Sequence, residues 1–185
     1  MLASLFTCAL TLQAAPEPLV VHAVVLLADN VHQGILPVRP PLGNGQSPGD
    51  NLYWGALYGF DTHFARTGWK RIQTAKPANP SVLAHSAFHK ALNGRTVIVV
   101  GEAWDGRHSR AFLERYFLLL SGDAERETVM APTGEVEVGA AAQLVVYIGH
   151  NVLMDIEPPP LAHLERRTIN TAILACQSDS YFSAP

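Results

Sequence analysis

A cysteine and a histidine are the residues of this sequence whose types and positions best suit covalent chemistry. Cys176 follows the apolar run at 169–175, and His150 follows the apolar run at 144–149. A thiolate is a strong nucleophile, and a neighbouring imidazole raises the fraction of a thiol that is ionised at neutral pH. The two residues therefore predict nucleophilic catalysis, provided that the fold brings the ends of the two runs together.

Four short apolar runs, rich in Val, Ile and Leu, would form the sheet that positions these residues. They lie at 19–28, 96–101, 144–149 and 169–175. None alternates between apolar and polar residues, which is typical of parallel strands that are buried on both faces. Helical spacing of apolar residues predicts helices at 50–64, 81–92 and 109–120, and Pro160 suits the start of a short helix at 161–167. The alternating segment 128–138 predicts a β-hairpin. This order predicts an α/β fold with a doubly wound, mostly parallel sheet and helices on both faces.

Polar residues follow each of the four runs, where open α/β sheets gather their ligands and catalytic groups. These residues are Asp29-Asn30, Glu102, His150-Asn151 and Cys176-Gln177. Adjacent strands lie about 4.8 Å apart. The connection between the third and fourth runs suits a single crossover, so we expect these runs to be neighbours. His150 and Cys176 would then lie side by side.

The composition indicates one globular domain. The chain has 185 residues, 48% of them hydrophobic and 16% charged, with a formal net charge of -3. That profile disfavours intrinsic disorder, and the absence of a basic run with interleaved aromatics argues against a nucleic-acid partner. No apolar segment is long enough for a stable membrane span.

Residues 1–15 predict a secretory signal peptide, because an apolar stretch is followed by small residues and Pro16. Residues 16–185 would then form the mature domain, exported to the periplasm or secreted; without this signal the protein would be cytoplasmic. Removal of the signal would also remove Cys8 and leave Cys176 as the only thiol, which is either inert in the core or reactive.

The two segments at 144–151 and 171–177 resemble the caspase-like superfamily of cysteine peptidases, which includes caspases, metacaspases, legumains and gingipains. They read LVVYIGHN and TAILACQ. The resemblance implies that His150 is the catalytic base and Cys176 the nucleophile. It also implies that the backbone at Asn151, where the family usually has glycine, binds the oxyanion.

The same resemblance implies a protein or peptide substrate and no cofactor, and it leaves the oligomeric state open. In the family, the segment after the first strand contributes to the substrate cleft, which makes Asp29, Asn30 and Arg39 candidate substrate-binding residues. The family continues with further strands and helices beyond its cysteine, whereas nine residues follow Cys176. We therefore expect a caspase-like domain that is incomplete at its C-terminal end.

The favoured function is a cysteine peptidase or related amide hydrolase that uses no metal. Two alternatives remain. One is a noncatalytic caspase-like binding module, which the missing glycine and the short C-terminal part favour. The other is a metal-binding α/β protein with Asp29, Glu102, His150 and Cys176 as ligands.

Overall fold

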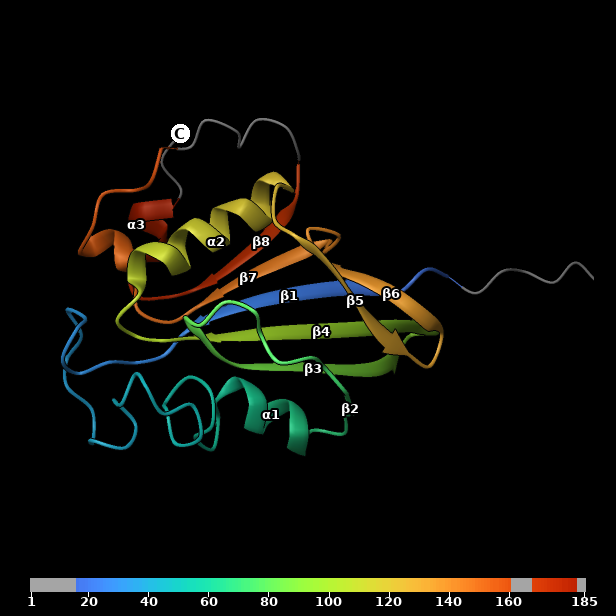
Figure 1. Cartoon of the computed structure of the whole chain (residues 1–185), viewed down its shortest axis with the longest axis horizontal. Helices are drawn as coiled ribbons and strands as arrows, with labels where there is room; N and C mark the ends of the chain where they lie inside the picture. Colours follow the sequence, from blue (N-terminus) through green and yellow to red (C-terminus); the bar gives the residue numbers. More distant parts are fainter. Residues whose placement is uncertain (1–15, 161–167, 183–185) are drawn as a thin grey trace, which may run out of the picture.

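A six-stranded sheet with the strand order β2-β3-β4-β1-β7-β8 organises the chain (Figure 1). The computed structural model describes residues 16–160 and 168–182. The predicted signal peptide at 1–15 and the predicted helix at 161–167 lie outside the described residues. The sheet strands are β1 (Leu19–Leu26), β2 (Lys70–Ile72), β3 (Val82–Leu92), β4 (Arg95–Trp104), β7 (Leu144–Ile148) and β8 (Asn170–Leu174). A separate antiparallel hairpin, as predicted, contains β5 (Arg126–Ala131) and β6 (Gly134–Gly139).

The four apolar runs form the parallel part of the sheet. β1 pairs in parallel with both β4 and β7, and β7 pairs in parallel with β8. The prediction that the third and fourth runs are neighbours is confirmed, and the first run lies beside the third. The prediction of a mostly parallel sheet is wrong, because β2 and β3 add two antiparallel pairings. The sheet is mixed.

The antiparallel part arises from the segment at 81–92, which the sequence predicted as a helix. It forms β3 and turns directly into β4 through Asn93 and Gly94, which have φ values of 49° and 77°. Two consecutive positive φ angles in an Asn-Gly pair are the signature of a tight hairpin turn. Asn and Gly also suit the end of a helix, so this pair is equally compatible with the helix that the sequence predicts at 81–92.

Two helices cover opposite faces of the sheet, as expected (Figure 1). Helix α2 (Ser109–Ser121) matches its predicted range closely, whereas α1 (Phe60–Arg66) is only the last part of the helix predicted at 50–64. Turns replace the rest, and glycines there allow the backbone to approach itself closely. A Cβ on Gly59 would lie 2.4 Å from the backbone of Trp54. Two short helical elements, η1 (Val152–Met154) and α3 (Ser178–Phe182), follow β7 and β8.

Alternation along β1 divides the core into two layers. Val24 and Leu26 pack in the layer that includes Phe112 of α2, and Ala23 and Val25 pack in the layer that includes Phe60 of α1. Burial on both faces explains why β1 has no polar face, apart from His22. No helix within residues 16–160 and 168–182 combines the length and apolar content needed to cross a membrane.

Candidate functional site

The parallel strands end at one edge of the sheet, called here the carboxyl edge and defined by Asp29, Asp105, His150 and Cys176. These four residues follow β1, β4, β7 and β8. Register keeps the ends level, because Leu26 pairs with Trp104 and Ile148 pairs with Leu174. The structure therefore brings the predicted His150 and Cys176 to neighbouring strand ends.

An asparagine joins the ends of β7 and β8. Asn151 is fully buried; its Nδ2 donates to the Cys176 carbonyl at 3.0 Å, and its Oδ1 accepts from the Leu153 N–H at 3.2 Å. Cys176 is exposed, whereas His150 is 6% exposed. Within the described part of the chain, no hydrogen bond joins the Cys176 thiol to the His150 ring.

The backbone at His150 is held by a buried tyrosine. The Tyr147 hydroxyl donates to the His150 carbonyl at 2.6 Å and accepts from the Val152 N–H at 3.1 Å. Gly149, just before the histidine, has φ 139°, and a Cβ there would lie 2.8 Å from the Leu26 carbonyl oxygen. A side chain at this position would be strained, so glycine permits the approach of β7 to β1.

The imidazole of His150 has a partner that the sequence analysis missed. Its Nε2 lies 2.7 Å from Asp155 Oδ2, and the same oxygen accepts the Gly34 N–H at 3.2 Å. Asp155 is five residues from His150, so nearness in sequence was a signal, but Glu157 lies almost as close. The contact depends on the turn at η1, which no local pattern specified.

A tyrosine lies within electrostatic reach of Cys176. Burial raises the pKa of Tyr53, and the negative charge of the Cys176 thiolate raises it further. Tyr53 belongs to the turns before α1 and packs against the α1-side core. The sequence predicts a continuous helix through this segment, at 50–64, whereas the structure has turns there.

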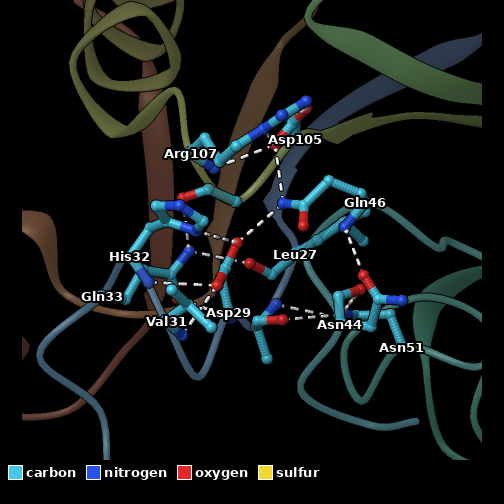
Figure 2. Close-up of polar contacts among 12 residues, drawn as sticks. Leu27, Asp29, Val31, His32, Gln33, Asn44, Gln46, Asn51, Asp105 and Arg107 are labelled. Carbon is cyan, nitrogen blue, oxygen red and sulfur yellow. Dashed lines mark hydrogen bonds and ion pairs between the residues drawn. The ribbon is translucent and has the colours of Figure 1, made fainter. Parts of the chain in front are cut away.

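Asp29 holds the loop that follows β1 (Figure 2). Its Oδ1 accepts from the backbone N–H groups of Val31 and His32, and its Oδ2 contacts His32 Nδ1 at 3.0 Å and Gln46 Nε2 at 2.7 Å. Burial acts to raise the pKa of Asp29, but these hydrogen bonds outweigh it and lower the pKa. The carboxylate is charged and is engaged within its own loop.

Asn30 and Arg39, the other two predicted substrate-binding residues, differ in their availability. The Asn30 side chain forms hydrogen bonds with the backbone of Val38 at 2.8 and 3.0 Å. The Arg39 side chain is exposed, and only its carbonyl takes part in the loop, by accepting from Leu42 and Gly43. Of the three, Arg39 is the one whose side chain faces solvent.

A second carboxylate at the carboxyl edge was not anticipated. Asp105 follows β4 and accepts hydrogen bonds from Arg107 and from Gln46 (Figure 2). The same Gln46 Nε2 also donates to Asp29, so Gln46 bridges the two carboxylates. Burial acts to raise the pKa of Asp105, but Arg107 and Gln46 lower it to about 2. The bridge ties the loop after β1 to the end of β4.

Glu102 lies inside β4 rather than after it, because the strand continues to Trp104. It accepts from Arg115 of α2 at 2.6 Å, contacts His22 at 2.9 Å and accepts from the Trp104 indole N–H at 2.9 Å. Burial acts to raise the pKa of Glu102, but His22 and Arg115 hold it well below its usual range. The residue is part of a buried network between β1, β4 and α2.

Because Glu102 lies inside β4, it is not at the carboxyl edge with Asp29, His150 and Cys176, the other ligands of the metal-binding alternative. Among residues 16–160 and 168–182, no three or more His, Cys, Asp or Glu side chains are grouped so that they could hold a metal ion. Glu102 instead lines a cavity of about 1080 Å³, together with His85, Arg115 and Glu127. Burial lowers the pKa of His85, although the carboxylates of Glu127 and Glu102 act in the opposite direction.

Comparison with family models, curated proteins and solved structures finds no match to this chain.

Proposed function

We propose that the protein is a cysteine hydrolase of the caspase-like type, a peptidase or related amide hydrolase acting on protein or peptide substrates. One observation carries this proposal: His150 and Cys176 follow adjacent parallel strands that are in register, and Asn151 connects the two strand ends. A nucleophile and its base require this kind of placement on rigid elements. The exposure of Cys176 gives a substrate access to the thiol.

In the proposed reaction, His150 takes the proton of the Cys176 thiol, and the sulfur attacks the amide carbonyl carbon. The C–N bond then breaks, and the amine leaves with the proton that His150 carried. Water hydrolyses the resulting thioester and regenerates the thiol. Backbone N–H groups near Asn151 would stabilise the oxyanion.

The loop after β1 would form the substrate side of the site. Its anchoring by Asp29 and Asn30 fixes its shape, and Arg39 projects into solvent, where it can contact a substrate. We also propose that the protein is exported, on the sequence of residues 1–15 alone, with a cytoplasmic location as the alternative.

The noncatalytic binding module remains the second candidate. It is favoured by the burial of His150 and by the lack, in the described structure, of a hydrogen bond between His150 and Cys176. A binding module needs no reactive thiol, so the chemistry of Cys176 separates the two functions.

Alkylation of Cys176 by iodoacetamide tests the proposal. We expect rapid labelling at pH 6, where an unpaired thiol is less than about 1% ionised. His150→Ala should slow it roughly tenfold or more, because the thiolate loses its partner. Peptide mass spectrometry distinguishes Cys176 from Cys8, and His108→Ala, at an exposed position, is the matched control. Equal, slow labelling of the wild type, His150→Ala and the unfolded chain would exclude the dyad.

Hydrolysis itself requires a second assay. The purified protein should cleave members of a mixed peptide library, with new termini read by mass spectrometry, and Cys176→Ala should produce none. A reactive thiol without any cleavage would favour the binding module.

A further inference from the structure

Asp155 is the side chain that holds the His150 ring, and a short helical turn delivers it there. Asn151 caps this turn by accepting the Leu153 N–H, and the Asp155 N–H donates to the Val152 carbonyl at 3.0 Å. The turn brings residue 155 back to residue 150, so that Asp155 Oδ2 lies 2.7 Å from His150 Nε2. The backbone geometry of the η1 turn therefore produces the contact between His150 and Asp155.

We propose that Asp155 is a positioning residue, which holds the proton of the neutral His150 ring on Nε2 and leaves the Nδ1 lone pair for the Cys176 thiol. This inference rests on the proposed function and assigns the third member of its site. A carboxylate accepts hydrogen bonds only, so the ring nitrogen that faces it must carry the proton. The other nitrogen of a neutral imidazole is then the acceptor that a general base requires.

The charge of Asp155 would also stabilise the ring after it takes the thiol proton. The imidazolium formed in that step has its Nε2–H directed at a carboxylate, which supports the positive charge. His150 is almost fully buried, and in such surroundings an unpaired imidazolium is costly. Asp155, whose side chain is 35% exposed, provides the counter-charge at the border with solvent.

Gly34 connects this carboxylate to the loop after β1. Its N–H donates to Asp155 Oδ2 at 3.2 Å, and a Cβ on Gly34 would lie 2.6 Å from Asp155 Oδ1. Only glycine allows the backbone at residue 34 to approach the Asp155 side chain this closely without moving the carboxylate. Gly34→Ala should therefore displace Asp155 while leaving every charge in place, which separates orientation from charge.

The first test reads the tautomer directly. In ¹⁵N NMR of the ring nitrogens at neutral pH, the wild type should show His150 protonated at Nε2, with a downfield Nε2 proton. Asp155→Ala should abolish that proton signal and mix the tautomers, Asp155→Glu should restore it in part, and Gly34→Ala should weaken it. Exposed His108 provides an internal reference, and Glu157→Ala removes a nearby exposed acid as the matched control.

The second test measures the iodoacetamide labelling of Cys176 in the same variants. Asp155→Ala should slow labelling several-fold, up to the effect of His150→Ala, because loss of an orienting carboxylate can remove most of the activity of a histidine base. Asp155→Glu should recover part of the rate, and Glu157→Ala should label like the wild type. If Asp155→Ala does not fold, Asp155→Glu and Gly34→Ala still decide the question.

The outcomes separate the two proposals. If His150→Ala slows labelling but the Asp155 and Gly34 variants retain the wild-type rate and the wild-type tautomer, Asp155 has no positioning role and the proposed function stands. If His150→Ala labels like the wild type, the proposed function fails whatever Asp155 does. A wild-type ring protonated at Nδ1 would overturn the positioning proposal by itself.

Discussion

Two buried asparagine side chains hold irregular segments in place at the carboxyl edge through hydrogen bonds to backbone groups. Asn51 and Asn151 are both fully buried, and each satisfies backbone groups of a different segment. Asn51 Oδ1 accepts the Ala28 N–H at 3.0 Å, while its Nδ2 donates to the carbonyls of Ala28 and Asn44 at 2.8 and 3.0 Å. Amides suit this role because one group supplies donors and an acceptor without adding charge. They hold two irregular loops against the ends of the strands.

We expect Asn51→Ala to lower the free energy of unfolding by about 1–3 kcal/mol or more, because it leaves buried backbone groups without partners. Urea denaturation at pH 7 measures the effect. Asp50→Ala alters the neighbouring exposed residue and should change stability by less than about 0.5 kcal/mol. Equal effects of the two substitutions would show that the Asn51 contacts contribute nothing.

At the scale of elements, a buried charged network connects α2 to the central strands. Glu102 of β4 contacts His22 of β1 and Arg115 of α2, and the Trp104 indole completes its hydrogen bonds. Phe112 and Leu113 pack in the core on the same face, and the ion pair adds a directional contact between α2 and β4. The network lies on the α2 face, so α2 serves to hold β1 and β4, which carry two of the loops at the carboxyl edge.

We expect Glu102→Gln to reduce the free energy of unfolding by about 3–5 kcal/mol, because the buried carboxylate that contacts both His22 and Arg115 is lost and Arg115 keeps only the longer contact to Glu127 at 3.9 Å. Glu114→Gln, on the exposed side of the same helix, is the matched control and should be nearly neutral. Thermal unfolding followed by circular dichroism compares the two. A Glu102 variant as stable as the control would mean that the network adds no net stability.

At the scale of the whole molecule, three carboxylates among the described residues have lowered pKa values, which couple folding to pH. Asp29, Glu102 and Asp105 all titrate below the values of 3.8, 4.5 and 3.8 expected for unperturbed groups. A carboxylate with a lower pKa in the folded than in the unfolded state binds protons less readily when folded. Its contribution to stability is complete above the unfolded pKa and is lost as the pH falls through the folded pKa.

We therefore expect the contribution of these three groups to the free energy of unfolding to change little from pH 7 to pH 5 and to fall steeply below about pH 4. Asp105→Asn should destabilise the protein at pH 7 but much less at pH 2, since the wild-type carboxylate titrates with a pKa of about 2. Urea titrations at a series of pH values measure both curves. Parallel curves for the wild type and the variant would contradict the coupling.

Local sequence determined the parallel half of this protein. Runs of Val, Ile and Leu suit parallel strands, so β1, β4, β7 and β8 were predictable, and with them the placement of His150 and Cys176 at one edge. Burial on both faces was predicted for all four runs, but β8 is the edge strand and is only partly buried. Helix α2 and the β5–β6 hairpin were predictable because each pattern repeats over many residues.

Tertiary structure decided the rest. The apolar spacing at 81–92 fits a helix, but pairing with β4 satisfied its backbone in a strand, and Asn93-Gly94 served as a hairpin turn. Likewise, Asp155 and Glu157 both lie close to His150 in the sequence. The turn at η1 determines that Asp155 is the partner of the imidazole. The physical reason is the same in both cases. A local pattern states which faces a segment can bury, whereas the choice among compatible conformations and partners depends on hydrogen bonds that form only when the elements pack together.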